Sequence, residues 1–117
     1  MRHRDTVTVF VPVDRDGFDI VWRKYVVKNV TLSVERSGDG DEGILYLFYD
    51  KARFYRGGKK VPPFKIRVGC AIINGVDGPE EEQFVIGLPP KKMLRVCEAE
   101  HFVSGSLRVR HTRLKLR

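Results

Sequence analysis

Apolar and polar residues alternate with a period of two along most of this chain. Residues 6–13 show this most clearly, with Val7, Val9, Val11 and Val13 set between Thr6, Thr8, Phe10 and Pro12. Such alternation predicts a strand with one buried face, and Pro12 favours an end or an edge there. The following Asp14-Arg15-Asp16-Gly17 predicts a turn, because glycine adopts a positive φ at little cost.

The same period continues beyond this turn. Residues 18–35 predict two strands, or one long bent strand broken near Lys28-Asn29. Further strands are expected at 44–49 and at 66–72, and residues 84–88 should be extended up to Pro89-Pro90. Periodicity leaves residues 91–102 open between a helix and a strand.

A last strand is expected at Leu107–Thr112, where apolar residues alternate with Arg108 and Arg110. Leu114 and Leu116 fall out of phase with Val109, which predicts a bulge near Thr112-Arg113. Two loops separate these strands: an acidic, glycine-rich one at 37–43 and a long projecting one at 51–63. The sum is an all-β fold, a small barrel or sandwich of six to eight strands with a long projecting loop, formed by residues 1–117 as one domain.

Composition limits the partners. The 117 residues are 42% hydrophobic and 32% charged, as in a globular protein, and carry a net charge of +7 with a pI near 9.7. A basic chain suits a nucleic acid or an acidic protein partner, although the charge can also serve solubility alone. The basic start leads into alternation, so neither a secretory signal nor a membrane span is expected.

No residue pattern indicates catalysis, a metal site or a cofactor. His3, His101 and His111 have no serine in a nucleophile elbow nearby, and a structural role is expected for them. Cys70 and Cys97 have no further cysteine or histidine at zinc-ligand spacing. We expect both to be reduced thiols of the core, and the chain not to be an enzyme.

Positive charge concentrates in two places. The 51–63 loop is a candidate contact for a nucleic-acid backbone, and its candidate residues are Arg53, Tyr55, Arg56, Lys59 and Lys60. The last strand forms a candidate basic interface, made of Arg108, Arg110, Arg113 and Lys115. This stripe suits a polyanion or an acidic partner, and equally a charged edge that blocks unwanted strand pairing.

A small nucleic-acid-binding barrel of the oligonucleotide-binding type is an alternative. Its bases would stack on Tyr46, Phe48 and Tyr49, which lie next to basic residues. The dense apolar run around these rings favours a place in the core instead.

Both ends of the chain resemble small head–tail connector proteins of tailed phages and prophages. The first match is Asp5-Thr6-Val7-Thr8-Val9-Phe10, followed by a Trp-bearing segment that leads into a strand at 22–30. The second is Gly105-Ser106-Leu107-Arg108-Val109-Arg110-His111, similar to a closing Gly-Ser turn and a strand with a histidine. In that register residues 94–99 are a strand. The middle matches only in its strand and loop pattern, and it departs at Gly69-Cys70.

The resemblance implies a structural role at the head–tail junction of a virion, reached from the cytoplasm of a bacterial host. Such head-completion or stopper subunits form homo-oligomeric rings below the portal, and they can be monomers alone. Expected partners are a portal or adaptor protein and tail proteins, with non-specific contact to packaged DNA. The 51–63 loop would then face the channel or the portal.

Overall fold

A computed structural model describes residues 3–37, 40–87 and 93–117 of the chain. In these ranges the protein is built from strands, all antiparallel to their neighbours, and contains no helix, so none that could cross a membrane. The strands are β1 (Asp5–Asp16), β2 (Asp19–Ser37), β3 (Gly40–Phe48), β4 (Arg53–Arg56), β5 (Lys59–Val61), β6 (Ala71–Asn74), β7 (Phe84–Ile86), β8 (Leu94–Phe102) and β9 (His111–Leu116).

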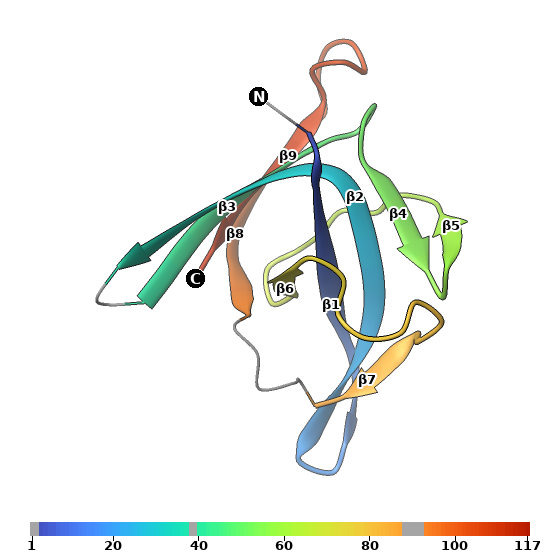
Figure 1. Cartoon of the computed structure of the whole chain (residues 1–117). Helices are drawn as coiled ribbons and strands as arrows, with labels where there is room; N and C mark the ends of the chain where they lie inside the picture. Colours follow the sequence, from blue (N-terminus) through green and yellow to red (C-terminus); the bar gives the residue numbers. More distant parts are fainter. Residues whose placement is uncertain (1–2, 38–39, 88–92) are drawn as a thin grey trace.

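The sheet closes on itself into an irregular barrel (Figure 1). Its strands follow the order β1-β6-β8-β9-β3-β2, and pairing of β1 with β2 completes the ring. The β4–β5 hairpin and β7 pair with β2 outside this ring. These strands confirm the predicted all-β fold, and closure leaves few unpaired edges.

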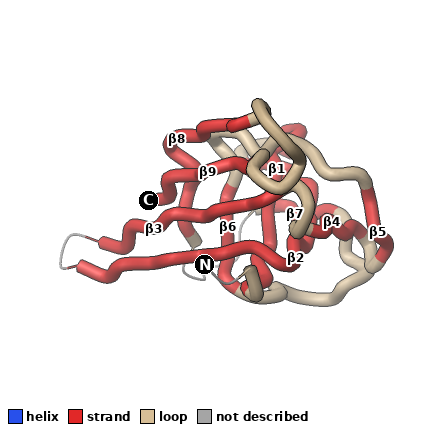
Figure 2. The backbone as a smooth tube through the Cα atoms, turned by 90° about the horizontal axis from the view of Figure 1, so that it is seen from above, coloured by secondary structure: helices blue, strands red, loops and turns tan. Residues whose placement is uncertain are grey.

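The central element is β2, a strand of 19 residues that bends at Asn29, where φ is 62°. Of the two predicted alternatives for residues 18–35, one long bent strand is therefore correct. Before the bend β2 pairs with β1, and after it β2 pairs with β3. Each pairing extends past the barrel as a hairpin, and Figure 2 shows the β2–β3 arm reaching out on one side.

The predicted acidic loop at 37–43 is wrong for most of its length. Gly40–Gly43 belongs to β3 and pairs with Val34–Ser37, and the remaining residues 38–39 lie outside the described ones. The glycines and acidic residues concealed this extension because they weaken strand propensity without preventing a ladder. A close approach between strands explains why glycine occupies position 43, since a Cβ there would lie 3.0 Å from Ser33 O.

The core lies on both faces of β1. Val7 and Val9 belong to the main cluster inside the barrel, together with Val27, Leu45 and Leu114. Phe10 lies on the opposite face and is fully buried against Trp22, Ala71 and Ile73. The alternating pattern puts Phe10 on the polar face, which is wrong because Trp22, Ala71 and Ile73 on the neighbouring strands form a second apolar cluster with it there. Burial of Phe10 and Trp22 contributes roughly 2–3 kcal/mol each.

The long projecting loop expected at 51–63 is also wrong. Residues 53–61 form the β4–β5 hairpin around Gly57-Gly58, whose φ values of 60° and 78° fit a type I′ turn. Phe54 is buried in the main cluster and holds the hairpin against the barrel. The segment is thus a short β-structure paired to β2.

Two other strand predictions need correction. Of the strand expected at 66–72, only Ala71 and Ile72 belong to β6. Ile66 is buried but lies in the loop before β6, and Gly69 in the same loop has a φ of 101°.

The C-terminal strand begins later than predicted. Residues 107–109 form a turn, so β9 begins only at His111. The predicted bulge near Thr112-Arg113 is absent from the regular pairing of β9 with β3. The irregularity lies instead in β8, between Val96 and Glu98. The strand expected at 94–99 is confirmed as part of β8.

Candidate functional site

The β4–β5 hairpin carries the residues of the predicted basic loop but divides them between two faces. Tyr55 packs beneath the Lys28 ammonium, 5.0 Å from its ring centroid. Arg53 turns back and donates to Asp50 O and Ala52 O, at 3.3 and 2.9 Å. Lys59 and Lys60 are exposed on β5. Among the candidate residues of the predicted loop, Lys59 and Lys60 are therefore the ones whose charge is not engaged with another described residue.

Arg56 faces the other way and joins β4 to β7. Its guanidinium lies 4.6 Å from the centroid of the Phe84 ring and 6.0 Å from that of Tyr25. Arg23 is the cross-strand neighbour of Phe84. The Nε atoms of Arg23 and Arg56 are buried with no hydrogen-bond partner in the described part of the chain. Stacking on aromatic rings is therefore the main interaction that holds Arg56.

The predicted basic interface strand also splits. Arg113 and Lys115 lie on the outward face of β9, but Arg108 and Arg110 belong to the turn before it. Arg113 lies 3.6 Å from a Glu100 carboxylate oxygen, and its Nε–H donates to Tyr46 Oη at 3.4 Å. These contacts, the Tyr46 hydrogen bond above all, raise the pKa of Arg113. Lys115 is paired across the sheet with Glu98, so this outward face carries mixed charge.

Four rings run in a row across one end of the same face. His111 stacks between Phe48 and Phe102, with centroid distances of 4.8 and 4.5 Å, and His3 lies 4.7 Å from Phe48. One face of the Phe48 ring and one face of the Phe102 ring are thus covered by His111. Of the three aromatics proposed as a base-stacking platform, Tyr46 and Phe48 lie on this outward face.

Tyr49, the third of these aromatics, packs against the core. Its hydroxyl lies 2.9 Å from Thr112 Oγ1, which is also 2.8 Å from Nδ1 of His101. Partial burial lowers the pKa of His101, and the charges of Lys65 and Arg67 lower it further. No local sequence pattern signals this Tyr49–Thr112–His101 chain of hydrogen bonds, because it depends on the pairing of β8 with β9.

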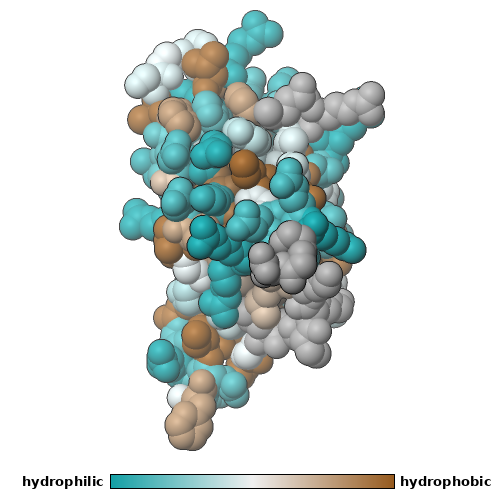
Figure 3. All heavy atoms as spheres, turned by 90° about the vertical axis from the view of Figure 1, so that its left-hand side faces the viewer, coloured by the Kyte–Doolittle hydropathy of each residue, from teal (hydrophilic) through white to brown (hydrophobic). Residues whose placement is uncertain are grey.

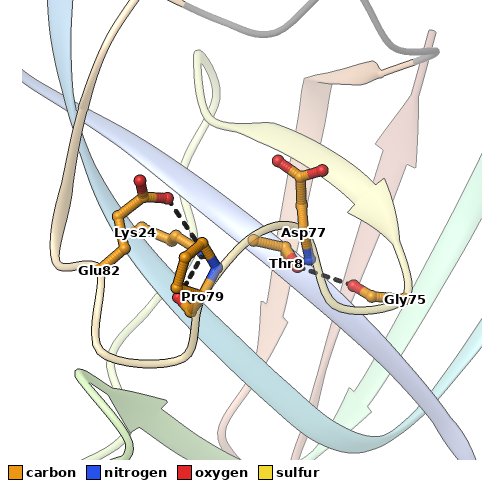
Figure 4. Close-up of polar contacts among 6 residues, drawn as sticks. All are labelled: Thr8, Lys24, Gly75, Asp77, Pro79 and Glu82. Atoms are coloured by element: carbon orange, nitrogen blue, oxygen red, sulfur yellow. Dashed lines mark hydrogen bonds and ion pairs between the residues drawn. The ribbon is translucent and has the colours of Figure 1, made fainter.

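A buried lysine fixes the loop that follows β6. Lys24 on β2 donates through Nζ to Pro79 O at 3.0 Å and to Glu82 Oε1 at 3.2 Å (Figure 4). Nearby, the Thr8 hydroxyl donates to Gly75 O at 2.7 Å and accepts from the Asp77 N–H at 3.1 Å. All four contacts lie within the fold, so this charged cluster has a structural role.

The two ends of the molecule differ in charge. The acidic tip, defined as residues 14–19 at the turn between β1 and β2, contains Asp14, Asp16 and Asp19 against one arginine. Phe18 at this tip is completely exposed. The β8–β9 loop, residues 103–110, contains Arg108 and Arg110 and no acidic residue. Figure 1 places the tip and this loop at opposite ends of the barrel.

Both ends also expose apolar side chains. In the β8–β9 loop Leu107 and Val109 are 55% and 54% exposed, and Phe102 and Val103 beside them are nearly as open. In the space-filling view an apolar side chain ends the lower tip, and further apolar ones lie near the upper end (Figure 3). Exposed apolar groups with polar neighbours mark contact surfaces on many proteins. The arginines of the β8–β9 loop are evident in the sequence, but the position of this loop opposite the acidic tip is not, because it depends on the closed sheet.

The described residues hold no group of three or more His, Cys, Asp or Glu side chains that could bind a metal ion. Cys70 is buried, which raises the pKa of its thiol, whereas Cys97 is half buried and its S–H donates to Lys115 O at 3.2 Å. No protein-family model, curated protein or solved structure matches this chain.

Proposed function

We propose that this protein is a structural head–tail connector subunit of a tailed phage or prophage, of the head-completion or stopper kind. It would assemble as a ring at the portal, with a portal or adaptor protein on one side and tail proteins on the other. It would not be an enzyme. The observation that carries the proposal is the fully exposed Phe18 at the end of a rigid β-hairpin. A partner that covers this ring would remove its apolar surface from water, which favours association.

Three further features support an assembly role. The barrel has two projecting hairpins, which can reach neighbouring subunits. Its ends are chemically different, as a subunit stacked between two different partners requires. The exposed Lys59 and Lys60 offer positive charge to packaged DNA or to the portal, whereas Arg53 and Arg56 are engaged within the subunit.

Disruption of this reading frame in the genome that encodes it tests the proposal. Particle formation is followed by electron microscopy and by counting infectious particles. The expected result is that heads and tails accumulate unjoined, that heads lose their DNA, and that the purified protein restores joining. A K59Q/K60Q variant should fold normally and retain DNA less well. Normal infectious particles without the protein would contradict the proposal.

A small β-barrel that binds single-stranded nucleic acid is the second candidate. Tyr46 and Phe48 face outward beside Arg113 and Lys115, as a stacking platform needs. Against it, Glu98 and Glu100 lie on the same face, and Phe48 already stacks on His111. Binding of oligonucleotides that weakens steeply with added salt and is lost in Y46A would favour this candidate. Weak binding that is indifferent to Y46A would count against it.

A further inference from the structure

The acidic tip and the β8–β9 loop are complementary in both charge and apolar surface. The tip has three aspartates and one arginine, a net charge of −2, around Phe18. The loop has two arginines and no acidic residue, a net charge of +2, around Leu107 and Val109. Opposite charges around apolar centres are the usual composition of a specific protein contact.

Both surfaces are held in fixed shapes. Asp14, Arg15 and Asp16 pair with residues 19–21 of β2, so the tip remains in a hydrogen-bonded ladder up to its two-residue turn. Gly17 opens that turn with a φ of 64°, and the Phe18 side chain that follows it is fully exposed. In the loop, Val109 N–H donates to Ser106 O and Arg110 Nε–H donates to Gly105 O. Preformed surfaces lose little entropy when they bind.

Within one copy the two surfaces cannot meet, because they lie at opposite ends of the barrel (Figure 1). We infer that the acidic tip of one copy binds the β8–β9 loop of a second copy, with Phe18 packed against Leu107 and Val109 and the aspartates beside Arg108 and Arg110. The contact joins two different patches, so it is heterologous, and repeated contacts of this kind close into a ring when the rotation between copies allows.

This inference rests on the proposed function for its ring geometry, and it names the partner of the exposed tip. The tip binds another copy of the same chain. Phe18 supplies the apolar anchor, and the charges select the orientation and speed the encounter. Added salt should therefore weaken the contact.

Disulfide trapping between two variants that each carry one exposed cysteine, with Cys70 left buried in both, tests the contact in the full chain. F18C and L107C are made in a C97S background, since serine can replace the Cys97 donor to Lys115 O. Both positions are exposed, so neither change should disturb folding. The matched control is V68C, at a residue that is 61% exposed in a different loop. The proteins are mixed at roughly millimolar concentration, where even a weak contact is populated.

The expected result is that F18C with L107C forms a disulfide at least tenfold faster than F18C with V68C, or than either variant alone. D14K/D16K should abolish this preference, and combining it with R108E/R110E on the other protein should restore it. Equal rates for L107C and V68C would overturn the inference. So would loss of head–tail joining in F18A with no trapping to L107C, since the tip would then bind a different protein.

The two proposals can fail separately. If the ends are trapped but loss of the protein leaves particles intact, the self-contact stands and the connector function falls. If the protein is required for joining but its ends are not trapped, the function stands and the contact falls.

Discussion

Lys24 and Glu82 form an ion pair with 3.2 Å between Nζ and Oε1, although 58 residues separate them in the sequence. The lysine side chain is 2% exposed and the glutamate side chain 39%. The ammonium also donates to the carbonyl of Pro79 at 3.0 Å. Because water screens the carboxylate of Glu82, the hydrogen bond to Pro79 O, which is the shorter of the two contacts, is the stronger tie between β2 and this loop.

K24M tests the relative strength of these two contacts, because methionine keeps the apolar part of the side chain and removes the ammonium. We expect its free energy of unfolding to fall by about 1–3 kcal/mol, since Pro79 O loses a buried donor. E82Q should cost less than about 1 kcal/mol. Urea unfolding of the two variants measures both values. Equal losses would show that the ion pair, and not the backbone contact, holds the loop.

Local alternation predicted a strand near the C-terminus but placed it at residues 107–112, with a bulge near Thr112-Arg113. In the structure β9 begins at His111 and alternates without a bulge, with Thr112, Leu114 and Leu116 toward the core and Arg113 and Lys115 outward. The same alternation misled at Leu107 and Val109, which lie in a turn and are exposed. Periodicity reports only which residues could share a face, and pairing with β3 and β8 decides where the strand begins.

The candidate site was harder to predict than the fold. Gly57-Gly58 is a two-residue hairpin signal, but the short flanking strands contain few apolar residues apart from Phe54. Without the hairpin, the face that carries Arg53 and Tyr55 could not be distinguished from the face that carries Arg56. The relation between the acidic tip and the β8–β9 loop depends on closure of the barrel, which no local pattern specifies.

His101 should give the protein a measurable pH dependence of stability. Its pKa in the folded state is lowered, first by burial and then by Lys65 and Arg67, below an unfolded value of about 6.5. As the pH falls, the unfolded state therefore binds this proton first, and stability declines until the pH passes the folded pKa. The wild-type protein should lose stability between about pH 7 and pH 5 relative to H101Q. A constant difference between the two proteins over this range would contradict the assignment.

The two cysteines should differ in reactivity. Cys70 is buried and its thiol pKa is raised, mainly by that burial, so little reactive thiolate forms near neutral pH. Cys97 is only half buried. Alkylation of the native protein at about pH 8, followed by mass spectrometry of peptides, should modify Cys97 well before Cys70. Both should react at similar rates in denaturant, which serves as the control, and equal native rates would contradict the placement of Cys70.

Arg56 should contribute to folding, in contrast to its neighbours on the β4–β5 hairpin. Its guanidinium stacks 4.6 Å from the Phe84 ring, whereas Lys59 and Lys60 are exposed. R56Q should lower the free energy of unfolding by about 1 kcal/mol, because the stacking contact between β4 and β7 is lost. K59Q and K60Q should each change it by less than about 0.5 kcal/mol.

A double-mutant cycle of R56Q with F84L isolates this contact from the other effects of each substitution. The coupling energy should be about 0.5–1 kcal/mol, the range for a partly exposed cation–π pair. Additive losses would mean that the Phe84 ring does not hold Arg56. In that case it would regain its place beside Lys59 and Lys60 as a residue available to a partner. A coupling in the expected range instead confines the available charge of this hairpin to the two lysines, because Arg56 is then required to keep β7 in place.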